Sequence, residues 1–84
     1  MTIPEIKEQL IDQIALSIGE EPSNIKSDMQ MHELGLDSLK LVELFIFIEK
    51  EFGVQLMAPG ISQDDIKTID AMAEYINTTK NEIL

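Results

Sequence analysis

Residues 34–54 read LGLDSLKLVELFIFIEKEFGV and contain the clearest helix signal of the chain. Asp37 is a strong helix N-cap and Gly53 a strong helix stop, so the pattern predicts a helix from Ser38 to Phe52. At about 100° per residue, one face of this helix is apolar throughout and should pack against the rest of the chain. That core face consists of Leu41, Leu44, Phe45, Ile48 and Phe52.

A second apolar stripe lies beside the core face of the same helix. It consists of Leu39, Val42 and Ile46, with Glu43 as a neighbour. A helix in a small bundle seldom buries two stripes, so we expect part of this one to face solvent or a partner. Phe47 falls still further round, opposite the core, where burial against a loop is the simplest expectation.

Helix signals also occur on both sides of this central stretch. Thr2 and Glu5 form a capping-box pattern, which predicts a first helix that ends near Gly19. Its apolar residues recur every fourth position, with further apolar residues beside them. The first set is Ile6, Leu10, Ile14 and Ile18, and the second is Ile3, Ile11 and Leu16.

The C-terminal third predicts a single helical turn followed by a last helix. Ser62 and Asp65 form a second capping-box pattern around the turn, and Thr68 can cap the helix that follows. The inward face of this last helix is Ile69, Met72, Ala73 and Ile76. Residues 19–36 lack periodicity and predict a long loop, attached to the core by scattered apolar side chains.

These elements predict an all-α fold with three main helices plus one short helix, and a long loop between helices one and two. Counted together, the four helices would form a four-helix bundle. A chain of 84 residues with 44% hydrophobic residues can close one core, so we expect residues 1–84 to form a single domain.

The composition excludes several classes of function. A formal charge of −10 repels phosphate backbones and anionic lipids, so we expect neither nucleic acid nor membranes as partners, whereas basic protein surfaces fit well. The absence of Cys excludes a disulfide framework, a Cys-based zinc site and a thiol nucleophile. No apolar run approaches a membrane span and no signal sequence is evident, which predicts a cytoplasmic protein.

The same charge predicts a property of the folded state. Folding brings like charges together, so self-repulsion should lower stability and added salt should raise it. If this repulsion also raises the pKa values of the native carboxyl groups, mild acid should stabilise the fold as well.

Few side chains in this sequence suit catalysis or metal binding. Ser38 and His32 are close in sequence, but a hydrolytic triad also needs an oxyanion hole and a substrate pocket, for which a small bundle has little room. His32 is most simply a solvated loop residue. Asp64 and Asp65 lack the pattern of a calcium loop and are better explained by capping. We therefore expect no catalytic residue and no metal ligand.

The Asp37-Ser38 pair admits two interpretations. It can be simply a good helix start, in which Ser38 has no further role. Alternatively, the unpaired N–H groups and positive dipole end of the helix would favour a phosphate attached to Ser38. Such a group would stand beside the stripe of Leu39, Val42 and Ile46, as a modification site beside a docking surface would.

The chain resembles the acyl and peptidyl carrier protein family in residues 34–39 (LGLDSL), 42–44 (VEL) and 48–54 (IEKEFGV). The resemblance covers essentially the whole chain, because the long loop, the short helix and the last helix follow the family's order. It implies that Ser38 accepts a 4'-phosphopantetheine arm from coenzyme A through a phosphopantetheinyl transferase. The thiol of that arm would hold intermediates as thioesters, and the protein itself would not be an enzyme.

The resemblance also implies a recognition surface. Partner enzymes would contact Asp37, Leu39, Val42, Glu43 and Ile46. Expected partners are an acyl- or aminoacyl-loading enzyme and ketosynthase- or condensation-type enzymes, and the carrier itself is expected to be a monomer.

The sequence departs from bacterial fatty-acid carriers in its second helix. Lys40 and Lys50 stand where those carriers commonly have acidic residues, and Phe45 and Phe47 add bulk. These differences favour a discrete carrier from a polyketide or nonribosomal peptide pathway over housekeeping fatty-acid synthesis. Two alternatives stay open: an aminoacyl or peptidyl carrier of the same family, and an unmodified helical module that binds a partner helix.

Overall fold

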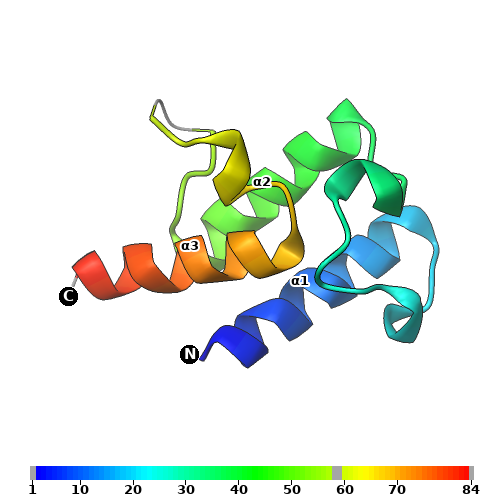
Figure 1. Ribbon diagram of the computed structural model, residues 1–84, viewed down its shortest axis with the longest axis horizontal. Coiled ribbons are helices and arrows are strands. Elements are labelled where there is room, and N and C mark those ends of the chain that lie inside the picture. The colour runs from blue at the N-terminus through cyan, green and yellow to red at the C-terminus, as the bar shows by residue number, and fades with distance from the viewer. Residues whose placement is uncertain (1, 58–59, 84) are drawn as a thin grey trace.

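The computed structural model describes residues 2–57 and 60–83, without the side chains of 81–83. It contains three α-helices, α1 (Ile3–Ile18), α2 (Ser38–Phe52) and α3 (Ile69–Ile83). Three short 3-10 turns, η1 (Pro22–Asn24), η2 (Met31–Leu34) and η3 (Gln63–Asp65), lie between them. The helices cross one another, and the long connection from α1 to α2 runs along one side of the molecule (Figure 1).

This architecture confirms the expected all-α fold. The short helix expected after Ser62 is the 3-10 turn η3, so the described residues form three α-helices and not a four-helix bundle. The long loop contains two turns that the sequence pattern did not predict, η1 and η2. None of the described helices is both long enough and apolar enough to cross a membrane.

The helix ends lie where the capping residues predict them. The Glu5 N–H donates to the Thr2 hydroxyl at 3.3 Å, and the Glu5 carboxylate accepts the Thr2 N–H at 2.9 Å. At the start of α3, the Thr68 hydroxyl accepts the N–H of Ala71 at 3.0 Å. Gly53 ends α2 with a φ of 71°, a conformation that costs a residue with a side chain more than it costs glycine.

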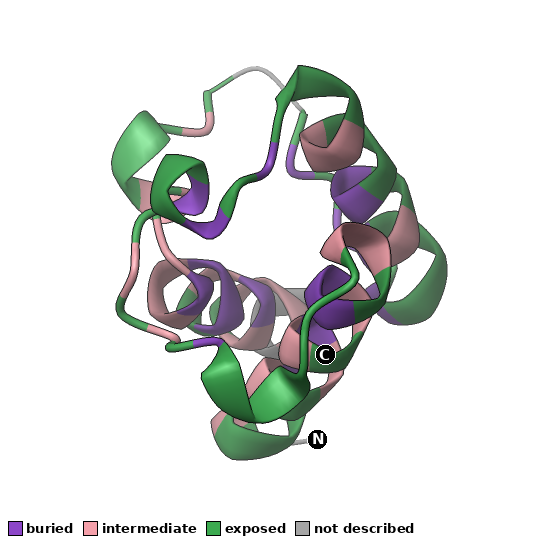
Figure 2. Cartoon of the chain, turned by 90° about the vertical axis from the view of Figure 1, so that its right-hand side faces the viewer, coloured by how far each residue is buried: buried purple, intermediate pink, exposed green. Residues whose placement is uncertain are grey.

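The core is formed by the inward faces of the three helices together with apolar residues of the loops. The buried segments of the helices face one another in Figure 2. The side chains with at most 1% exposure are Ile6, Leu10, Ile14, Ile48, Ile69, Met72, Ala73 and Ile76. All eight belong to the faces expected from the sequence.

Three apolar residues differ from their expected environments. Leu16 is 79% exposed, although the sequence pattern places it beside the apolar stripe of the first helix. Leu41 is only half-buried, because it packs against the core with one side and lines a surface hollow with another. Phe47 is half-buried against the core, with its ring edge-on to Phe52 at 6.4 Å between centroids, and is not opposite the core as the helical angle suggested.

Backbone hydrogen bonds attach the long loop to the segment before α3. The N–H of Met31 donates to the carbonyl of Lys67 at 3.0 Å, next to an antiparallel bridge between Gln30 and Thr68. The N–H of Asp70 likewise donates to the carbonyl of Ser27 at 3.0 Å. The loop that leads to α2 is therefore held by the start of α3.

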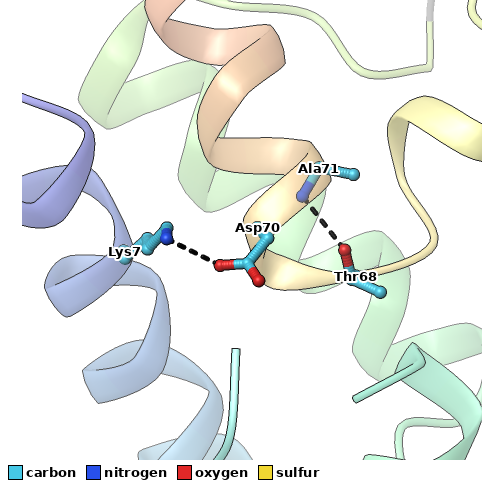
Figure 3. Close-up of polar contacts among 4 residues, drawn as sticks. All are labelled: Lys7, Thr68, Asp70 and Ala71. Atoms are coloured by element: carbon cyan, nitrogen blue, oxygen red, sulfur yellow. Dashed lines mark hydrogen bonds and ion pairs between the residues drawn. The ribbon is translucent and has the colours of Figure 1, made fainter. Parts of the chain in front are cut away.

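A polar cluster joins the same loop to both α1 and α3. Lys7 on α1 and Asp70 in the first turn of α3 form an ion pair of 2.7 Å (Figure 3). Hydrogen bonds from Lys7 and then from Ser27 lower the pKa of Asp70. Hydrogen bonds from Thr2 and Asn24 also lower the pKa values of Glu5 and Glu20, respectively. The condition that native carboxyl pKa values rise is therefore not met at these three groups, because hydrogen-bond donors lower each pKa by more than desolvation raises it.

Candidate functional site

Ser38 is the first residue of α2 and is exposed to solvent. The preceding residue provides the helix cap, because the Asp37 carboxylate accepts the N–H of Lys40 at 2.9 Å. Gly35 ends η2 with a φ of 85° and lets the chain turn toward this helix start. The Ser38 hydroxyl is therefore not needed for capping and lies at the positive end of a helix of 15 residues.

The second apolar stripe of α2 is exposed, as its position on the helix predicted. Leu39 is 69% exposed, Val42 40% and Ile46 42%. Glu43 is exposed on the same helix. The structure thus places the apolar residues and Glu43 on one helix that begins at Ser38, with the Asp37 carboxylate at its N-cap, a mixture typical of docking surfaces.

An open hollow of about 510 Å³ lies on another side of Ser38. It is bounded by η2, the first turn of α2 and the segment that leads to α3. Leu41 and Ile66 are half-buried in its lining, whereas His32 and Lys67 are exposed there. The hollow therefore combines apolar and polar walls directly beside the serine.

No sequence pattern indicates that Lys67 shares a hollow with Ser38 and His32, which are close to each other in sequence. His32 and Lys67 lie on segments brought together by the hydrogen bond from Met31 to the Lys67 carbonyl, and no local pattern encodes that pairing. His32 is exposed, in agreement with its interpretation as a solvated loop residue.

The space between α1 and α2 is much smaller. A crevice of about 10 Å³ lies there, lined in part by Gln13, Lys40 and Glu43. That volume is about enough for one water molecule. Lys40 therefore lines a different side of α2 from the open hollow beside Ser38.

The acidic pair near η3 has structural contacts. The Asp65 carboxylate accepts the N–H of Ser62 at 3.4 Å, which confirms the capping interpretation. Asp64 lies 3.6 Å from the ammonium group of Lys67. Within residues 2–57 and 60–83, no three His, Asp or Glu side chains are grouped closely enough to hold a metal ion.

Comparison with known proteins identifies the family. Residues 2–83 match the family model of the C-terminal ACP domain of the highly reducing polyketide synthase sdgA. The acyl carrier protein of Chloroherpeton thalassium is 36% identical over 77 residues, which cover 90% of this chain and 94% of the relative. That of Chlorobium phaeobacteroides is also 36% identical over 77 residues, covering 90% and 96% of the two chains.

The fold and these matches define a small helical carrier, a class of protein that is not catalytic. The matches cover at least 90% of the chain, so they identify the family of the whole carrier. The chain belongs to the acyl carrier protein family. Membership of this family implies attachment of phosphopantetheine, and partners that attach the arm or use its cargo.

Proposed function

We propose that this acyl carrier protein holds biosynthetic intermediates as thioesters on a 4'-phosphopantetheine arm at Ser38. The observation that carries the proposal is the exposed serine at the first position of α2, where Asp37 already makes the cap. Unpaired backbone N–H groups at this helix end favour a phosphate. The arm would supply the thiol that a chain without Cys lacks.

Attachment requires only one reactive group of this chain. The Ser38 hydroxyl oxygen forms a bond to the phosphorus that bears the pantetheine of coenzyme A. The bond from that phosphorus to the bridging oxygen breaks, and adenosine 3',5'-bisphosphate leaves. The serine proton passes to a base on the phosphopantetheinyl transferase. Exposure of Ser38 supports this assignment, because the transferase must reach the hydroxyl from solvent.

We propose that partner enzymes dock on Asp37, Leu39, Val42, Glu43 and Ile46. The exposure of Leu39, Val42 and Ile46 supports this surface, because neighbouring exposed apolar side chains on one helix stripe often mark an interaction site. The carboxylates would attract Lys and Arg around a partner's active-site entrance. The partners would be the transferase, an acyl- or aminoacyl-loading enzyme, and ketosynthase- or condensation-type enzymes.

A polyketide pathway is the assignment that we favour. The family model that matches residues 2–83 describes a polyketide synthase domain. The departures from fatty-acid carriers at Lys40 and Lys50 also argue against housekeeping fatty-acid synthesis. A nonribosomal peptide pathway is the alternative. We further propose that residues 1–84 act as a single, monomeric carrier domain in the cytoplasm.

The test is the intact mass of the protein after incubation with coenzyme A and a promiscuous phosphopantetheinyl transferase. The wild type should gain the mass of one phosphopantetheine, and Ser38→Ala should gain none. Ser23→Ala and Ser62→Ala are matched controls at other exposed serines and should be modified like the wild type. Modification of Ser38→Ala would refute the site.

An unmodified helical interaction module is the second candidate. The 69% exposure of Leu39 favours it, because a partner helix could cover this stripe without any arm. An unmodified wild type in the mass experiment, together with partner binding that Leu39→Asp abolishes, would favour this module over the carrier.

A further inference from the structure

Lys67 faces the same hollow as Ser38, although 29 positions separate them in the sequence. Its backbone is held in place, because its carbonyl accepts the N–H of Met31 at 3.0 Å. Its side chain is 57% exposed and therefore free to reorient toward a group in the hollow. The fold thus fixes the backbone of this lysine, whereas its side chain can move the ammonium group.

The present partner of Lys67 holds it only weakly. Asp64 lies 3.6 Å away, and its side chain is 87% exposed. An ion pair this exposed is screened by solvent and contributes little free energy. A phosphate group in the hollow could therefore compete for the lysine.

Other cations near the start of α2 lie elsewhere. Lys40 lines the narrow crevice between α1 and α2. Among the described residues that line the hollow, Lys67 is the one lysine. In a chain of formal charge −10, with the Asp37 carboxylate next to Ser38, a phosphodiester on this serine would have an anion beside it and Lys67 in the lining of the same hollow.

We propose that Lys67 is a positioning residue that attracts the phosphodiester on Ser38 and directs the arm across the hollow toward residues 63–67. This inference rests on the proposed attachment at Ser38. The hollow of about 510 Å³ falls within the size range of small-molecule sites. Leu41 and Ile66 are apolar residues in its lining, which the arm beyond its phosphate would contact.

The experiment compares backbone amide NMR shifts of the unmodified and phosphopantetheine-bearing forms. In the wild type, attachment should shift the amides of 63–67 as well as those of 37–40. Lys67→Glu should remove most of the shift at 63–67, and Lys67→Arg should keep it. Lys26→Glu is the matched control: it changes the charge equally at an exposed position outside the hollow, and should leave the shifts unchanged.

Each outcome has a defined meaning. A protein that gains no arm refutes the proposed function at Ser38. A protein that gains the arm and shifts only 37–40 overturns the role of Lys67, as does an identical pattern in Lys67→Glu. If Lys67→Glu fails to fold, the role of Lys67 is tested instead by adding sodium chloride to the phosphopantetheine-bearing wild type and measuring the same amide shifts. Screening should reduce the shifts at 63–67, and unchanged shifts would overturn the inference.

Discussion

Replacing Asp70 by Asn should measure how much the polar cluster between α1 and α3 contributes to stability. The substitution keeps the size of the side chain and removes its charge. The side chains of Lys7 and Asp70 are 34% and 39% exposed, so solvent screening limits the ion pair to about 0.5 kcal/mol. Loss of a negative charge from the first turn of α3 adds about 0.5 kcal/mol through the helix dipole. The expected loss of unfolding free energy is therefore about 1 kcal/mol.

Thermal unfolding followed by circular dichroism can detect this difference. A loss of about 1 kcal/mol lowers the Tm of a domain of this size by about 4–8 °C. Asp64→Asn is the control. The contact of Asp64 with Lys67 is longer and more exposed, so this substitution should change the Tm little. A double-mutant cycle with Lys7→Gln isolates the ion pair from the dipole contribution.

The pH dependence of this difference follows from the lowered pKa of Asp70. A carboxyl whose pKa is lower in the folded state stabilises the fold above its unfolded pKa, which is about 3.9 for Asp. This stabilisation is lost as the pH falls through the folded pKa. The gap between wild type and Asp70→Asn should therefore be full at pH 7 and should close below about pH 4. An equal gap at pH 7 and pH 3, or no coupling to Lys7, would refute the reasoning.

Three further predictions concern docking, the core and charge. Glu43→Lys should slow transfer to a partner enzyme and flatten its salt dependence, whereas Ile46→Asp should weaken binding at every ionic strength; transfer rates equal to wild type in both would place the docking surface elsewhere. Met72→Ala, at a fully buried position, should lower the unfolding free energy by about 2–5 kcal/mol in denaturant titrations, and a loss below about 1 kcal/mol would mean that the core refills the space. Monovalent salt should raise the Tm at neutral pH because it screens a formal charge of −10, and a Tm independent of salt would show that local pairing already cancels the repulsion.

Helix boundaries could be predicted from the sequence because capping is local. Thr2, Asp37 and Thr68 each bind an N–H within three residues, so a short pattern contains the whole interaction. The environment of Phe47 could not be predicted in this way. Its burial depends on Phe52 and on the core residues that it packs against, and not on its angular position alone.

The candidate site was predictable in one part only. Ser38 and the stripe on α2 belong to one continuous helix, so their spacing in the sequence is also their spacing in space. Lys67 reaches the hollow through the pairing of the long loop with the start of α3, which joins distant segments. The direction of the Asp70 pKa shift could not be predicted either, because net charge does not reveal the donors from Lys7 and Ser27 to this carboxyl group.

The two faces of α2 have different consequences for how such a protein can evolve. Leu44 and Ile48 are buried, so substitutions there are constrained by the fold. Leu39 and Glu43 are exposed on the same helix, and substitutions there change little inside the molecule. Natural selection can therefore alter the outer face for a new enzyme while the inner face keeps the protein folded. Within one helix, a lineage could change its partners many times without first having to recover lost stability.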